Sequence, residues 1–68
     1  MKWKLLKYMS EQRIKSFREL SQLTGIDYRT LLKHIENINQ MRVYELKTLA
    51  EVLRLTDEDV LELLRGEG

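Results

Sequence analysis

Four polar side chains in the middle of the chain recur at helical spacing, and each of them can donate hydrogen bonds. Arg29 and Lys33 lie four residues apart, so a helix would point both cations to the same side. Thr30 and Asn37 lie near that side. A helix that is held by aliphatic residues and shows these polar groups could lie in a DNA major groove. An ordinary solvated helix face has the same pattern, and this stretch alone leaves both interpretations open.

The apolar residues of the same stretch fall on the other side of the helical wheel. Leu31, Ile35 and Ile38 occupy one narrow arc when successive residues are placed about 100° apart. Tyr28 and Leu32 lie at the edge of this arc. The stretch therefore predicts a short amphipathic helix whose aliphatic side is buried.

The residues before this helix have the chemistry of a tight turn. Gly25 can adopt the positive φ that ends a preceding helix, and Asp27 can cap the next one. Ile26, between them, is expected to fill the turn with an apolar side chain. Upstream, Ser16 and Glu19 have the spacing of a capping box, in which each side chain accepts from the other residue's backbone N–H. Two short helices joined by a turn are therefore predicted.

Apolar periodicity and capping patterns extend this prediction to an all-α fold with a single domain over residues 1–68. The five expected helices cover residues 2–12, 17–24, 28–37, 43–54 and 57–65. The expected core residues of the other helices share helical spacing: Leu5, Leu6, Met9, Phe17, Leu20, Leu23 or Thr24, Leu46, Leu49, Ala50, Leu53, Val60, Leu61 and Leu64. The second capping-box pattern runs from Thr56 to Asp59.

Residues near the ends of the helices carry three further expectations. Arg13 ends the first helix where a glycine would be easier, and a left-handed conformation there would cost about 1 kcal/mol. Trp3 is expected to pack across the chain ends. Gly66 is expected to end the last helix.

Composition argues against several kinds of site. The chain has no cysteine and a single histidine, which excludes disulfides and makes a zinc site improbable. No glycine-rich phosphate loop and no evident pair of catalytic acids is present, so neither an enzyme nor a cofactor is expected. No apolar run approaches the roughly 18 residues of a membrane span, and there is no secretory leader. The expected location is the cytoplasm.

Charge is unevenly distributed along the chain. Residues 1–34 contain eight Lys/Arg and three Asp/Glu, whereas residues 35–68 contain four and eight. A basic half indicates polyanion binding, although many small helical domains also have mixed polar faces.

Several short stretches match a known family. They are Lys4-Leu5-Leu6, Met9, Glu19-Leu20-Ser21, Thr24-Gly25-Ile26, Thr30-Leu31, Glu36-Asn37, Leu46, Thr48-Leu49-Ala50 and Leu53. Over nearly its whole length the chain resembles the helix-turn-helix domains of Cro/CI-type phage repressors and their bacterial relatives, the xenobiotic-response-element (XRE) family, and especially a small standalone branch. The resemblance implies a lambda-repressor-like bundle of five helices. The third helix would be the recognition helix in the major groove, and the second would cross the DNA backbone.

The chain departs from the family at Phe17 and in two spacings, of which the one from Ile14 to Leu20 is one residue longer than usual. The other spacing, from Gly25 to Glu36, leaves the register of the third helix open. Phe17 stands where the family often has a glutamine that contacts a phosphate, and the spacing from Gly25 to Glu36 is also one residue longer than usual. Counting from either end of this spacing gives different base-reading positions, and Arg29 belongs to both sets. The candidate base readers are Arg29, Thr30, Lys33, Tyr28 and His34. Candidate contacts to the DNA backbone are Lys15, Ser16, Phe17, Arg18, Asp27, Asn37, Asn39 and Arg42.

His34 has a second interpretation as a flanking or partly buried residue. The expected function is a sequence-specific, repressor-like transcriptional regulator that binds double-stranded DNA as a homodimer, without a small-molecule ligand. Val52 and Leu63 lie off the expected buried arcs and are candidates for the dimer surface. The alternative is an anti-repressor-like interaction module whose acidic last helix contacts a basic partner.

Overall fold

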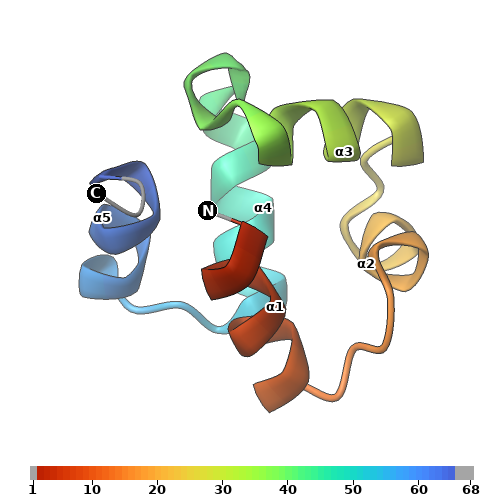
Figure 1. Cartoon of the computed structure of the whole chain (residues 1–68), viewed down its shortest axis with the longest axis horizontal. Helices are drawn as coiled ribbons and strands as arrows, with labels where there is room; N and C mark the ends of the chain where they lie inside the picture. Colours follow the sequence, from red (N-terminus) through yellow and green to blue (C-terminus); the bar gives the residue numbers. More distant parts are fainter. Residues whose placement is uncertain (1, 66–68) are drawn as a thin grey trace.

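The computed structural model describes residues 2–65, and between them the chain forms five α-helices, one short 3-10 helix and no strand (Figure 1). The elements are α1 (Lys2–Glu11), α2 (Phe17–Thr24), α3 (Tyr28–Glu36), η1 (Ile38–Gln40), α4 (Val43–Leu53) and α5 (Asp57–Arg65). The all-α fold class is confirmed. The first, third and fourth α-helices each end one residue earlier than expected, and Gly66 lies outside the described residues.

The helices are arranged around α4, which runs through the middle of the molecule (Figure 1). α2 and α3 lie on one side of α4, and α5 lies on the other. α2 contacts both α3 and α4, whereas η1 contacts α3 and α5. The helix-turn-helix unit of α2 and α3 therefore packs on α4 and η1.

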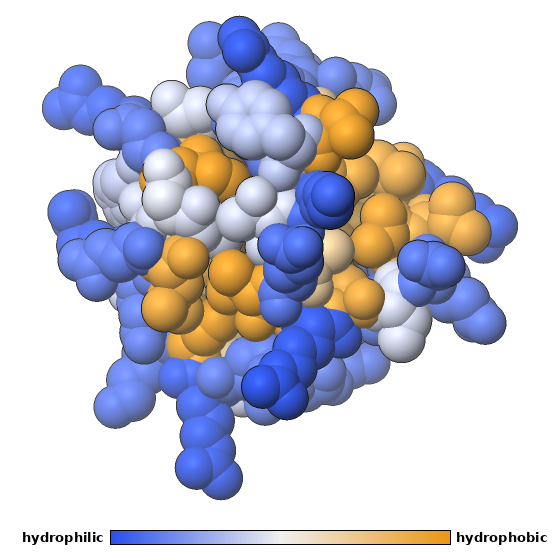
Figure 2. Space-filling view, turned by 180° about the vertical axis from the view of Figure 1, so that it is seen from behind, coloured by the Kyte–Doolittle hydropathy of each residue, from blue (hydrophilic) through white to orange (hydrophobic). Residues whose placement is uncertain are grey.

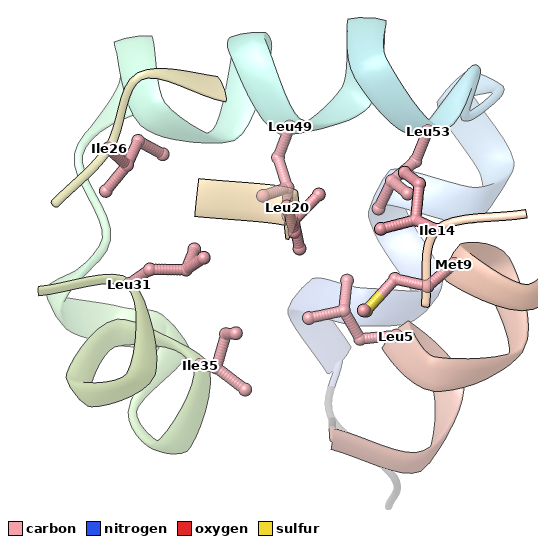
Figure 3. Packing of buried hydrophobic residues seen from close by; sticks show 9 residues of the cluster. All are labelled: Leu5, Met9, Ile14, Leu20, Ile26, Leu31, Ile35, Leu49 and Leu53. Carbon is pink, nitrogen blue, oxygen red and sulfur yellow. The ribbon is translucent and has the colours of Figure 1, made fainter. Parts of the chain in front are cut away.

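One apolar cluster holds the helices together. Figure 3 shows its side chains converging from α1, α2, α3 and α4 and from the loops between them. Its members are Leu5, Met9, Ile14, Leu20, Ile26, Leu31, Ile35, Leu49 and Leu53. Leu31 and Ile35 are buried, as expected, so the aliphatic side of α3 is fixed on the core and its polar side must face outward.

The capping box of α2 is formed only in part. Ser16 is extended and its Oγ accepts from the backbone N–H of Glu19 at 3.1 Å, as predicted. The Glu19 carboxylate, however, accepts from the N–H of Lys15 at 2.9 Å, one residue before the expected donor. The return bond therefore ties the loop before the helix to its first turn.

The turn between α2 and α3 is closed by side chains as well as by glycine. Gly25 has φ 76° and donates its N–H to the carbonyl of Ser21 at 2.9 Å. The Ser21 hydroxyl donates to the carbonyl of Ile26 at 2.6 Å. Thr24, rather than Leu23, is the more buried of the two candidates at the end of α2. These bonds fix the angle at which α3 leaves α2.

Two arginines have left-handed backbone conformations. Arg13 has φ 60°, as anticipated for the residue that ends α1, and Arg54 has φ 56° after α4. The Arg54 N–H bonds to the carbonyls of the last turn of α4, so this residue serves as a helix C-cap. Each conformation costs an L-residue about 1 kcal/mol relative to the right-handed region.

The prediction for Trp3 is wrong. Its side chain is 80% exposed. Leu5 and Met9 turn α1 toward the core, and at about 100° per residue Trp3 then falls on the opposite side of the helix.

The prediction for α5 is wrong about which side of the helix faces the core. Leu63 is completely buried, whereas Leu61 and Leu64 are 50% and 46% exposed and Val60 is half-buried. Figure 2 shows apolar surface on the side of the molecule where α5 lies. Val52 packs partly buried against the core cluster. Val52 and Leu63 therefore cannot form the expected dimer surface.

Two contacts with α1 agree with this rotation of α5. The hydroxyl of Tyr8 donates to Asp59 at 3.2 Å, and the ammonium of Lys4 lies 3.1 Å from the carboxylate of Glu62. Both acids face α1, and the completely buried Leu63 follows directly after Glu62 in the helix.

Candidate nucleic-acid interface

The outward side of α3 brings two of the predicted base readers together. Arg29 and Lys33 are both exposed and lie one helical turn apart. Among residues 2–65, no salt bridge engages either side chain. Within α3 the acidic residue is Glu36, which is also exposed and lies three residues after Lys33. This side of α3 therefore presents two cations that are available to a ligand.

Thr30 lies at the edge of this side rather than at its centre. It is half-buried and lines a shallow polar groove together with Tyr44 and Thr48 of α4. The Asp27 carboxylate caps α3, accepting from the N–H groups of Arg29 and Thr30 at 3.1 and 3.3 Å. Asp27 was predicted to contact the DNA backbone, but its carboxylate instead binds the first turn of α3.

Tyr28 supports another residue of the predicted interface. The Arg18 guanidinium lies over its ring, 4.4 Å from the centroid, in a cation–π contact between the first turns of α2 and α3. Tyr28 is half-buried, whereas Arg18 remains exposed. The contact holds the Arg18 cation close to the N-terminus of α3.

The beginning of α2 presents cations and free backbone donors. Lys15, Ser16 and Arg18 are exposed, but Phe17 is half-buried against the core cluster. The aromatic side chain of Phe17 is therefore taken up by packing. The first N–H groups of any α-helix have no acceptor within the helix, and they can bind an anion instead.

The loop after α3 carries the remaining residues that are predicted to contact the DNA backbone. Asn37, Asn39 and Arg42 are all exposed. Asn37 ends α3 by donating its N–H to the carbonyl of Lys33 at 3.2 Å, and it also begins η1. The loop therefore lies directly beyond the last turn of α3.

His34 does not share the outward side with Arg29 and Lys33. Its side chain is only 14% exposed, and its Nδ1 lies 2.8 Å from Oε1 of Glu45 on α4. This placement agrees with the interpretation of His34 as a partly buried residue. The structure thus separates the five candidate base readers, with Arg29 and Lys33 outward and His34 toward α4.

Glu45 is the residue that sequence reasoning missed. Its side chain is 4% exposed, and its Oε1 also accepts from the Arg42 N–H at 2.9 Å. A signal was present, because Glu45 stands three residues after the cap position of α4, where glutamate often accepts from the cap N–H. Nothing in the spacing indicated the contact with His34.

The two groups with shifted pKa values, Tyr8 and Asp59, lie away from this interface, between α1 and α5. A hydrogen bond from the Thr56 backbone N–H lowers the pKa of Asp59 below its ordinary value, and the Tyr8 hydroxyl contributes in the same direction. Burial raises the pKa of Tyr8, and the neighbouring Asp59 charge adds to this. Among residues 2–65 there is no cluster of His, Cys, Asp or Glu that could hold a metal ion. Within this range, no helix has the length and apolar character needed to span a membrane.

Comparison with known families gives one match. The family described as Cro/C1-type HTH DNA-binding domain matches residues 4–64 of the 68-residue chain. Comparisons with curated proteins and with solved structures gave no match. The match covers all of the helix-turn-helix unit and the helices that support it.

Proposed function

Because this chain belongs to the family of Cro/C1-type helix-turn-helix DNA-binding domains, we propose that it is a sequence-specific, repressor-like regulator of transcription. It reads the major groove of double-stranded DNA with α3. The observation that carries this proposal is the pair of exposed cations, Arg29 and Lys33, on the outward side of a helix whose other side is fixed to the core.

Arg29 is the principal base reader of the proposal. It lies in the first turn of α3, the end of a recognition helix that contacts base edges. A guanidinium matches the O6 and N7 acceptors of guanine with two parallel hydrogen bonds. Lys33, one turn later, contacts a neighbouring base edge or a phosphate. Thr30 is a secondary contact at the edge of the same side.

Cations at both ends of α3 set the position of the domain on the phosphates. Lys15 and Arg18 lie before and within the first turn of α2, and Arg42 lies in the loop after η1. Such contacts supply affinity and register but carry no sequence information. The exposed amides of Asn37 and Asn39 donate to phosphates beside Arg42.

Two copies are needed to read a palindromic site. The longest dimension of the Cα trace is 27 Å. Successive major-groove half-sites are about 34 Å apart, so one copy cannot serve both. The exposed apolar side chains of Leu61 and Leu64 on α5 form the surface that a second copy covers.

The cellular role follows from this mode of binding. A homodimer seated on an operator excludes other proteins from the same grooves, which is the simplest form of repression. The protein would then act in the cytoplasm, associated with the nucleoid while it is bound.

Selection of bound sites from random duplexes, followed by titration of the recovered site at low and high salt, tests the proposal. A recurring palindromic sequence and an affinity that falls steeply with salt are expected. No enrichment, with no duplex binding even at low salt, would contradict it. The alternative would then be an interaction module, for which the acidic α5 with exposed Leu61 and Leu64 is the candidate surface.

A further inference from the structure

Glu45 joins two parts of the molecule through one carboxylate oxygen. Its Oε1 accepts from the Arg42 backbone N–H at 2.9 Å and lies 2.8 Å from His34 Nδ1. A carboxylate can only accept in this arrangement, so the imidazole Nδ1 donates. The oxygen thus connects the last turn of α3 with the first turn of α4 and with the end of the loop over residues 37–42.

Burial makes this connection strong. The Glu45 and His34 side chains are 4% and 14% exposed, so water cannot readily replace either partner. A buried carboxylate that loses a donor keeps its desolvation cost without compensation. The two residues are therefore held to one mutual geometry, and α3 cannot rotate about its axis without breaking the bond.

Glu45 connects α3 with the loop over residues 37–42, and these two elements have different roles in the proposed function. α3 carries the base readers Arg29 and Lys33, whereas the loop carries the phosphate contacts Asn39 and Arg42. Base readout requires that the reading side chains and the phosphate anchors keep a fixed spacing. A shift of α3 relative to the loop would leave the cations present but misplace them against the base edges.

We propose that Glu45 and His34 are positioning residues for DNA reading: their buried bond sets the orientation of α3 relative to the phosphate-binding loop. This inference rests on the proposed function. It also assigns His34 a role that differs from direct base contact, because its Nδ1 is committed to Glu45. Sequence preference should depend on the bond, while attraction to DNA in general should not.

The experiment compares variants on the wild-type selected duplex and on a scrambled duplex. His34→Leu removes the donor but keeps an apolar body of similar bulk. His34→Asn places an amide N–H near the position of Nδ1 and should restore the bond. Glu45→Ala removes the acceptor. The double variant of His34→Leu with Glu45→Ala completes a thermodynamic cycle.

Asp59 provides a matched control. It has the same two kinds of contact in α5, accepting from the cap N–H of Thr56 at 3.0 Å and from the Tyr8 hydroxyl on another helix at 3.2 Å. Asp59→Ala therefore measures the effect of losing a helix cap and an interhelical bond away from α3. All titrations are made below the melting temperature of the least stable variant.

His34→Leu and Glu45→Ala should each lose about tenfold in affinity for the selected duplex and less than about twofold for the scrambled one. The double variant should be little worse than either single one, His34→Asn should stay near wild type, and Asp59→Ala should leave the preference unchanged. Equal losses on both duplexes, or additive losses in the cycle, would overturn the inference. A retained preference in His34→Leu would overturn it as well. Failure of the proposed function looks different, because wild type itself would then select no site.

Discussion

Arg29 and Lys33 share the outward side of α3, but in the proposed function they have different roles. Arginine presents a planar fork that recognises paired acceptors, whereas lysine is a flexible point charge that serves phosphates equally well. Specificity should therefore depend on Arg29 more than on Lys33. Lys15, in the loop before α2, is a pure phosphate contact in this account.

Substitution of Lys15 tests this division of roles. Lys15→Ala should weaken binding to the selected and scrambled duplexes by the same factor, because a phosphate contact is independent of sequence. It should also flatten the dependence of log affinity on log salt by about one unit. Fluorescence anisotropy titrations at several salt concentrations measure both quantities. A loss confined to the selected duplex would show that Lys15 reads sequence.

At the residue scale, the sequence was informative where a property depends on one helix. The outward direction of Arg29 follows from the positions of Leu31 and Ile35 in the same helix, and these are buried as predicted. The bond between His34 and Glu45 joins two helices, and it depends on how α4 packs against α3. Local spacing carries no information on that packing.

At the scale of elements, the stability of the bundle depends on side chains that several helices share. Leu20 and Leu49 are completely buried in the core cluster. Leu20→Ala and Leu49→Ala should each lower the free energy of unfolding by roughly 2–5 kcal/mol through lost burial and a residual cavity. Because the free energy of unfolding of small domains is only about 5–15 kcal/mol, much of the population should unfold on mild heating. Thermal melting measures the change, and a loss below about 1 kcal/mol would place these residues outside the core.

The N-terminal cap of α5, which Asp59 forms with Thr56, should respond to acid. The lowered pKa of Asp59 means that its carboxylate stabilises the folded state at pH values above the unfolded pKa of 3.8. That contribution is lost as the pH falls through the folded pKa. Asp59→Asn removes it, so wild type should lose more stability than the variant between about pH 5 and about pH 2. Urea denaturation across this range measures the difference, and parallel curves would contradict the assignment.

The helices themselves were predictable, because their caps and apolar periods are local. Ser16, Gly25 and Asp27 mark the ends of α2 and α3 where the structure has them. The rotation of α5 was not predictable. Apolar residues occupy several positions around this helix, and which of them is buried depends on how α5 packs on the rest of the molecule.

At the scale of the whole molecule, basic and acidic residues are unevenly distributed among the helices. The basic first half of the sequence forms α1, α2 and most of α3, whereas the acidic second half includes α4 and α5 (Figure 1). If the cations of α2 and α3 bind DNA phosphates as proposed, the association rate should fall with salt.

Dimerisation on DNA should depend on the exposed side of α5. Changing Leu61 and Leu64 to serine removes apolar surface that is already half exposed, so folding should be retained. The variant should bind a single half-site as well as wild type, but it should lose the preference for the complete palindrome. Sedimentation with each duplex gives the stoichiometry. A two-to-one complex that is unaffected by both substitutions would place the dimer surface elsewhere.

The central claim is that α3 reads base sequence, and titration of Arg29→Ala on the selected and scrambled duplexes tests it most directly. Arg29 is exposed, so the fold should be little changed. The substitution should cost about 1–3 kcal/mol on the selected duplex, relax the preference at one base pair per half-site, and leave scrambled binding nearly unchanged. An equal loss on both duplexes would make Arg29 a phosphate contact. No loss on either duplex, with the fold intact, would contradict the claim that α3 is the reading element.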